Sequence, residues 1–115
     1  MHELSIAMSI LEGVEEEVSR GGYGTVNAIH IRVGVLSGVM PAALLSAFEM
    51  AREGTPFAQC ALRIEDAPAL IRCSACGQDS PLPSIQAMSC PACERPPAEI
   101  IGGQELEVIG LELAT

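Results

Sequence analysis

The residues of this 115-residue chain best suited to chemistry are four cysteines in its second half. Cys73 and Cys76 form one Cys-x-x-Cys pair, and Cys90 and Cys93 form another after thirteen intervening residues. A pair at this spacing can direct two thiolates to one ion from a tight loop, and two pairs complete a tetrahedral all-sulfur shell for zinc. Four thiolates leave the ion no open position for a reaction. The spacing therefore predicts a structural zinc site.

Two other interpretations of the cysteine pairs have to be weighed. A dithiol redox centre needs a single Cys-x-x-Cys that opens a helix in a βαβ setting, and it leaves the second pair without a role. An iron-sulfur cluster uses the same four thiolates, so spacing alone separates it from zinc only weakly. The fifth cysteine, Cys60, lies in an alternating apolar stretch and is expected to be a small core residue.

The second candidate site is the amino terminus, which reads Met1-His2-Glu3. The terminal amine, the deprotonated amide nitrogen of His2 and its imidazole Nδ1 can chelate one ion through fused rings. The fourth corner of this planar arrangement is open to the Glu3 amide nitrogen or to an outside ligand. Planar nitrogen sites suit Ni(II) or Cu(II), whereas zinc prefers tetrahedral surroundings.

A two-residue motif has low specificity, and simpler explanations exist for each residue. An exposed terminal histidine need not bind anything, and an acid such as Glu3 in the first turn of a helix complements the helix dipole. The other histidine, His30, is expected to be a solvated residue on the polar face of a strand. The residues alone therefore leave open whether the terminus binds a metal.

The charge of the chain excludes two classes of partner. The formal net charge is −9, and a zinc ion held by four thiolates adds −2, which gives −11. Such a surface repels phosphate backbones and anionic lipids. We therefore expect neither nucleic-acid binding nor membrane binding.

The cysteine usage and the absence of targeting signals predict the compartment. Cysteines arranged as metal pairs are typical of a reducing environment. No basic region precedes the first apolar residues, and the largely apolar run 39–48 contains Pro41 and is too short to cross a bilayer. We expect a soluble, cytoplasmic protein.

Apolar periodicity predicts two helices and three strands around these sites. Gly21-Gly22 ends the first helix, and Pro41 suits the first position of the second. The expected elements are a helix at 3–20, a strand at 25–36, a helix from 41 that ends before Gly54, a strand at 58–66 and a strand at 105–113.

These elements predict an α+β fold in which two helices pack on a small three-stranded mixed sheet, with the four-cysteine zinc module inserted before the last strand. A helical crossover makes the first two strands parallel, whereas the third is free to pair antiparallel. We expect residues 1–70 and 100–115 to form the α/β domain and residues 71–99 the zinc-binding module.

Several short motifs occur in a fixed order along nearly the whole chain. They are Met1-His2-Glu3-Leu4-Ser5, Val33-Gly34-Val35-Leu36-Ser37 followed by Pro41, Ala47-Phe48-Glu49, Gly54-Thr55, the two cysteine pairs, and Gly103-Gln104-Glu105-Leu106. In this order they resemble the HypA family, the nickel metallochaperones for maturation of nickel-iron hydrogenases and, in some bacteria, urease. Glu94 departs from the pattern, because the family usually has glycine after the fourth zinc cysteine.

The resemblance implies a protein with two metal sites and no enzymatic activity. The nickel site falls on Met1, His2 and Glu3, within the α/β domain, and the structural zinc falls on Cys73, Cys76, Cys90 and Cys93. Family members pass Ni(II) on with a HypB-type nickel GTPase toward the hydrogenase large-subunit precursor. The alternative is a zinc-ribbon protein-interaction adaptor that transports no metal.

Overall fold

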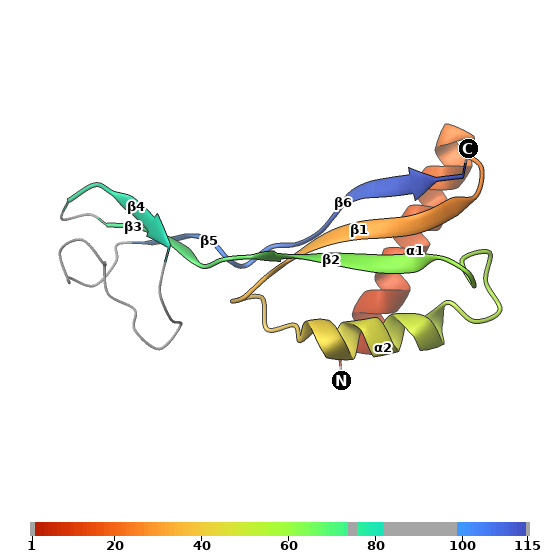
Figure 1. The fold of residues 1–115 in the computed structure, drawn as a ribbon, viewed down its shortest axis with the longest axis horizontal. Coiled ribbons are helices and arrows are strands. Elements are labelled where there is room, and N and C mark those ends of the chain that lie inside the picture. The colour runs from red at the N-terminus through yellow and green to blue at the C-terminus, as the bar shows by residue number, and fades with distance from the viewer. Residues whose placement is uncertain (1, 74–75, 82–98, 115) are drawn as a thin grey trace. The chain divides into compact units, whose positions relative to one another are not determined.

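The computed structural model describes residues 2–73, 76–81 and 99–114 (Figure 1). The chain forms two compact units. The first unit comprises Met1–Ile31, Val39–Glu65 and Glu107–Thr115, and the second comprises Arg32–Gly38 and Asp66–Leu106. Within the described residues, no helix is both long and apolar enough to cross a membrane.

The first helix, α1, spans His2–Gly21 and buries Ala7, Leu11 and Val14 along one face. These residues lie three or four apart, as the helical period requires for one stripe. The helix ends with the Tyr23 N–H bonded to the Val18 carbonyl at 3.2 Å, the 6→1 bond of a Schellman motif. The predicted first helix is confirmed, with one additional residue at each end.

The apolar stripe of α1 is narrower than the sequence suggests. Leu4 and Met8 are 41% and 51% exposed, although the periodicity predicts them on the buried face. Burial begins only at Ala7, one turn beyond the amino terminus. The first turn of α1 therefore remains accessible to solvent.

The second helix, α2, spans Pro41–Ala51 and packs against α1. Pro41 occupies the first turn, where its missing N–H costs no helical hydrogen bond. Leu44 and Phe48 are almost completely buried. Each such side chain contributes roughly 2 kcal/mol through burial of apolar surface.

Three strands, β1 (Val26–Gly34), β2 (Ala61–Ala67) and β6 (Leu106–Leu113), form one sheet in the order β2-β1-β6. The Ala114 N–H bonds to the Thr25 carbonyl at 2.9 Å, so the end of β6 meets the start of β1 and the two are antiparallel. Figure 1 shows β2 running in the same direction as β1. The predicted three-stranded mixed sheet is confirmed.

Burial of alternate side chains continues only to the end of β1, which is shorter than the predicted strand at 25–36. Ile29, Ile31 and Val33 are at most 2% exposed, in agreement with the prediction. Val35, which would continue the same alternation, is 52% exposed. Strand β1 ends at Gly34 and the chain enters a turn, closed by a bond from the Ser37 N–H to the Gly34 carbonyl.

A second three-stranded sheet, absent from the prediction, lies in the second unit. It consists of β3 (Leu70–Arg72), β4 (Asp79–Pro81) and β5 (Glu99–Gly102) in the antiparallel order β4-β3-β5. Strands of three or four residues are too short for an alternating pattern to be recognised in the sequence. The expectation of a single sheet was therefore incomplete.

In the second unit, Gly34 and Gly103 allow two backbone segments to approach each other closely. A Cβ atom on Gly34 would lie 2.0 Å from the carbonyl oxygen of Gly103, far inside contact distance. Two short bonds form here, from the Gly34 N–H to the Glu105 carbonyl at 2.7 Å and from the Leu36 N–H to the Gly103 carbonyl at 2.6 Å. Only a residue without a side chain permits this approach.

We predict that Gly34→Ala destabilises the protein by at least about 3 kcal/mol, because the methyl group must displace backbone and break these hydrogen bonds. Urea unfolding followed by circular dichroism would measure the loss.

Gly13→Ala is the matched control, since the chemical change is the same. Gly13 is exposed within α1, and a Cβ there meets no atom within 4 Å. This substitution should stabilise the protein by about 0.5–1 kcal/mol through helix propensity. Equal effects of the two variants would contradict the steric explanation.

Candidate metal centres

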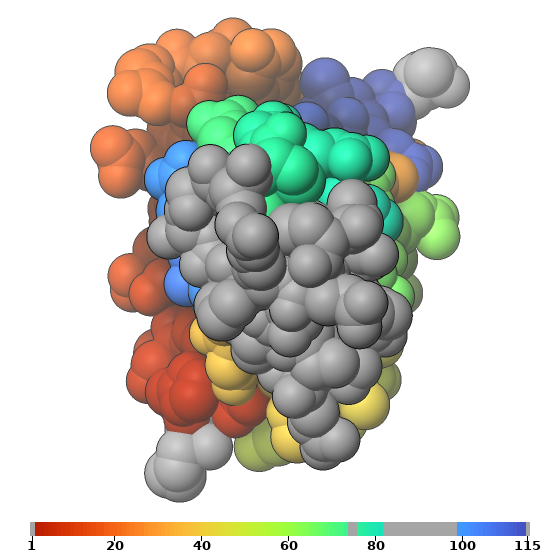
Figure 2. All heavy atoms as spheres, turned by 90° about the vertical axis from the view of Figure 1, so that its left-hand side faces the viewer, coloured from red at the N-terminus to blue at the C-terminus, as the bar shows by residue number. Residues whose placement is uncertain are grey.

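The first cysteine pair lies immediately after β3. Cys73 is completely buried, whereas Cys76 is exposed in the following turn. Figure 2 shows the segment 76–81 at the molecular surface. With this arrangement, Cys73 can bind an ion from the protein interior while Cys76 binds it from the surface.

Local hydrogen bonds give this turn its shape. The Gly77 N–H bonds to the Cys73 carbonyl at 2.7 Å, and the Cys73 N–H bonds to the Gln78 carbonyl at 3.1 Å. Gly77 has a φ of 71°, in the left-handed region that favours glycine. The turn therefore holds Cys73 and Cys76 within one tight loop, as a zinc knuckle requires.

An arginine next to the first cysteine joins the three strands of the second sheet. The Arg72 guanidinium donates to both carboxylate oxygens of Asp79 at 2.9 and 3.2 Å and reaches Glu99 at 3.5 Å. The hydrogen bond from Arg72 lowers the pKa of Asp79. These groups are about half exposed, so their main effect is to fix the strand register beside Cys73 rather than to add much stability.

The two described members of the predicted zinc site, Cys73 and Cys76, fit a thiolate donor set. Neither forms a disulfide. Cys90 and Cys93 lie outside the described residues. No cluster of three or more histidine, cysteine or acidic side chains occurs in the described part of the chain, so assignment of the complete zinc site remains a prediction.

Cys60 is a core residue, as predicted. Its side chain is 1% exposed, and burial raises the pKa of its thiol. The raised pKa disfavours the thiolate, which is the form that binds a metal, and no second cysteine stands at Cys-x-x-Cys spacing from Cys60.

At the amino terminus, His2 is exposed and occupies the first position of α1, while Glu3 is half-buried in the same turn. Figure 2 shows the start of this helix at the surface. Met1 lies outside the described residues. The first N–H groups of a helix have no intrahelical acceptor, so the His2 amide can lose its proton without breaking a helical hydrogen bond.

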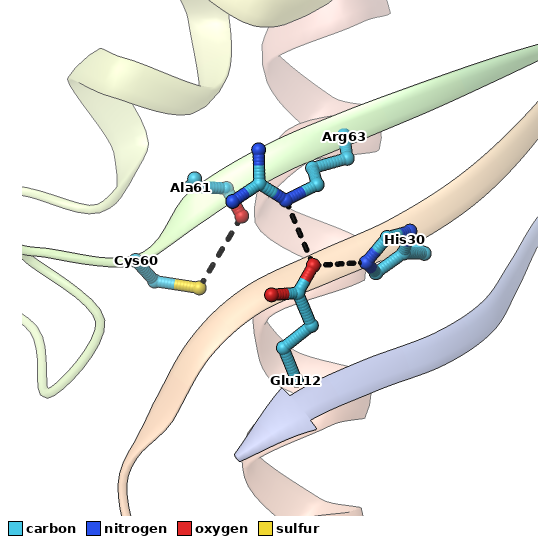
Figure 3. Close-up of polar contacts among 5 residues, drawn as sticks. All are labelled: His30, Cys60, Ala61, Arg63 and Glu112. Carbon is cyan, nitrogen blue, oxygen red and sulfur yellow. Dashed lines mark hydrogen bonds and ion pairs between the residues drawn. The ribbon is translucent and has the colours of Figure 1, made fainter. Parts of the chain in front are cut away.

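A polar cluster that the sequence did not predict lies across the first sheet (Figure 3). His30 of β1 and Arg63 of β2 both bond to Glu112 of β6, Arg63 through its Nε at 2.8 Å. His30 is exposed to solvent on the polar face of its strand, as expected, but it is also hydrogen-bonded to Glu112, a partner that the prediction did not include. Hydrogen bonds from His30 and then Arg63 lower the pKa of Glu112. The partners are far apart in sequence, so only knowledge of strand register could have revealed them.

Comparisons with known proteins cover nearly the whole chain. A family model described as hydrogenase/urease nickel incorporation, metallochaperone, hypA matches residues 1–113. A hydrogenase maturation factor HypA from Chloroflexus aurantiacus is 39% identical over 112 residues, covering 97% of this chain and 98% of that protein. The protein of the same name from Chlorobaculum parvum is 42% identical over 108 residues, covering 94% of this chain and 95% of that protein.

A solved structure has the same fold. The solution structure of the Ni metallochaperone HypA from Helicobacter pylori matches with a TM-score of 0.69, covering 98% of this chain and 97% of that chain at 24% identity.

We predict that Cys73→Ala lowers the zinc content of the purified protein well below that of the unsubstituted protein, because one of four thiolates is lost. Helical circular dichroism should persist, since α1 and α2 belong to the other unit. Metal analysis by mass spectrometry measures the first quantity.

Cys60→Ala is the control for the loss of a buried thiol and should retain zinc. Unchanged zinc in Cys73→Ala would refute the ligand assignment, and loss of all helical signal would show that the two units do not fold separately.

A further prediction concerns the pH dependence of protein stability. Because the folded pKa of Glu112 lies below its unfolded pKa, the carboxylate stabilises the fold above the unfolded value, and this contribution is lost as pH falls through the folded value. Glu112→Gln should therefore lower the urea midpoint at neutral pH and have little effect near pH 3.

Glu12→Gln, an exposed change on α1, serves as the control and should shift the midpoint little at either pH. If Glu112→Gln lowered the urea midpoint as much near pH 3 as at neutral pH, the stabilisation could not come from the charge of the Glu112 carboxylate.

Proposed function

The chain belongs to the HypA family of hydrogenase and urease nickel-incorporation metallochaperones, and from this premise we propose that it binds Ni(II) at its amino terminus and delivers it for maturation of a nickel-iron hydrogenase. Urease is the alternative recipient of the nickel, because the family model also names urease. The observation that carries the proposal is the exposed imidazole of His2 at the first position of α1.

The ligands on Met1, His2 and Glu3 act together. The terminal amine, the His2 amide nitrogen and the His2 imidazole supply three nitrogens, and the Glu3 amide nitrogen or an outside ligand supplies the fourth. A helix amino terminus disfavours a cation by about 0.3–1 kcal/mol, but each deprotonated amide brings a negative charge to the site that offsets this effect. The planar nitrogen set favours Ni(II) over zinc.

The location of this site suits transfer of the ion. The His2 side chain is exposed, and full burial on α1 starts only at Ala7, so little folding free energy depends on the conformation of His2. An incoming ligand can occupy the fourth corner and then replace a nitrogen. The amide and the imidazole must lose protons to bind, so nickel affinity falls as pH drops.

The zinc site has a structural role in this proposal. Zinc held by Cys73, Cys76, Cys90 and Cys93 would join residues distant in sequence and leave no coordination position for catalysis. The turn at Cys73 and Cys76 supplies half of the ligands, and the Arg72 ion pairs hold the strands beside it. We therefore assign the protein no enzymatic activity.

The partners follow from the family and the delivery role. We propose a HypB-type nickel GTPase as the protein that exchanges nickel with this chain, and the hydrogenase large-subunit precursor as the destination. The names of the relatives support hydrogenase maturation as the process.

We predict that His2→Ala abolishes stoichiometric Ni(II) binding by the untagged protein, because the chelate loses its imidazole. Equilibrium dialysis with metal analysis, and the absorption spectrum of planar Ni(II), would report the loss. His30→Ala, which removes the other histidine, should bind nickel normally.

A peptide tag on the amino terminus should have the same effect as His2→Ala, since it removes the free amine from position one. Zinc content should be unchanged in every variant. Unaltered nickel binding by His2→Ala would refute the site, and zinc without nickel in the untagged wild type would support the adaptor function instead.

A further inference from the structure

The first unit contains a pocket of about 380 Å³ on the side of α1 away from its amino terminus. Three segments form it: the last turns of α1, the chain that enters β1, and the loop after α2. Its apolar lining is provided by Val18, Val26, Pro56 and Phe57. Pockets of this size and character commonly accept a ligand or a side chain.

Hydrogen bonds preform the wall contributed by the loop. The Thr55 hydroxyl donates to the Arg52 carbonyl at 2.6 Å and accepts the Phe57 N–H at 3.1 Å. Phe57 and Val26 are only 5% and 6% exposed, so they form a fixed floor. An occupant would therefore meet an existing surface rather than one that must be ordered first.

The polar side chains of the pocket favour a cation. Glu15, Ser19 and Thr25 contribute one carboxylate and two hydroxyl groups, all of which can accept hydrogen bonds. In residues 2–73, 76–81 and 99–114, no hydrogen bond or ion pair engages the Glu15 carboxylate. The carboxyl end of α1 lies at the same place, and its dipole also favours positive charge.

We propose that this pocket receives an arginine side chain from a partner protein. The methylene stem of arginine would pack on Val18 and Phe57, while its planar guanidinium has enough donors for the Glu15 carboxylate and both hydroxyl groups. Arginine is also enriched among the residues that dominate binding free energy at protein interfaces. The net charge of −9 would steer a basic partner surface toward this site.

We assign the arginine to a different protein rather than to a second copy of this chain. The chain has no lysine, and the five arginines among the described residues, Arg20, Arg32, Arg52, Arg63 and Arg72, each already have an interaction partner, while Arg95 lies outside the described residues. Two copies with a charge of −9 also repel each other. The proposal does not depend on nickel binding, because none of the pocket residues belongs to either metal site.

The test is a titration of the ¹⁵N-labelled, zinc-containing protein with N-acetyl-arginine amide, followed by amide chemical shifts. Saturable shifts are expected at Ser19, Gly24, Thr25 and Phe57. N-acetyl-citrulline amide, which has nearly the same shape but no charge, should produce much smaller shifts. Free arginine should bind no more tightly than the capped form, because only the side chain is recognised.

Glu15→Gln should weaken binding of the capped arginine by about fivefold, because the ion pair is lost. Glu16→Gln removes the same charge from an exposed neighbour outside the pocket and should have little effect. Equal affinity of Glu15→Gln and Glu16→Gln, equal binding of citrulline, or shifts confined to other residues would overturn the proposal. Markedly tighter binding of free arginine would overturn the proposal of a protein partner, because it would indicate that the ligand is the free amino acid.

Discussion

The close backbone approach at Gly34 and Gly103 is the constraint on which the second unit depends. Around it, the end of β1 bonds to residues 103–105, and the Val35 N–H bonds to the Ala67 carbonyl at 3.0 Å. A Cβ on Gly103 would itself lie 2.7 Å from the Cα of Ala69. Three chain segments thus meet where no side chain fits: the end of β1, residues 67–69 and residues 103–105. The second segment precedes the cysteine segment in the sequence, and the third follows it. This explains why Val33–Ser37 and Gly103–Leu106 both carry recognisable motifs.

The parts of the fold that the sequence predicted correctly are those fixed by local physics. Helical spacing predicted α1, and Pro41 predicted the start of α2, because periodicity and backbone restriction act within a few residues. The mixed sheet followed from the crossover rule. Strands β3, β4 and β5 could not be predicted, because their stability comes from register and from Arg72 bonding across to Asp79 and Glu99. These contacts join residues up to 32 positions apart, as in the pairing of Leu70 with Gly102.

The same distinction applies to the candidate sites. The thiol pair at Cys73 and Cys76 can be read from spacing, since one turn determines its geometry. The bond of His30 to Glu112 spans 82 positions, so alternation could place His30 on the polar face of its strand but could not identify its partner. The pocket beside Glu15 was missed for a similar reason. Its walls come from three segments that are separated in the sequence.

The two proposed metal sites require opposite local environments. A structural ion is held most firmly when its ligands belong to the packed unit, and Cys73 meets this condition because it is fully buried and both its N–H and its carbonyl are bonded within the turn. An ion that must leave needs ligands whose movement costs little folding free energy. His2 meets that condition, since it is exposed and its amide needs no helical acceptor. In the proposed function, zinc retention and nickel release would therefore depend on different parts of the fold, and neither would require a large conformational change.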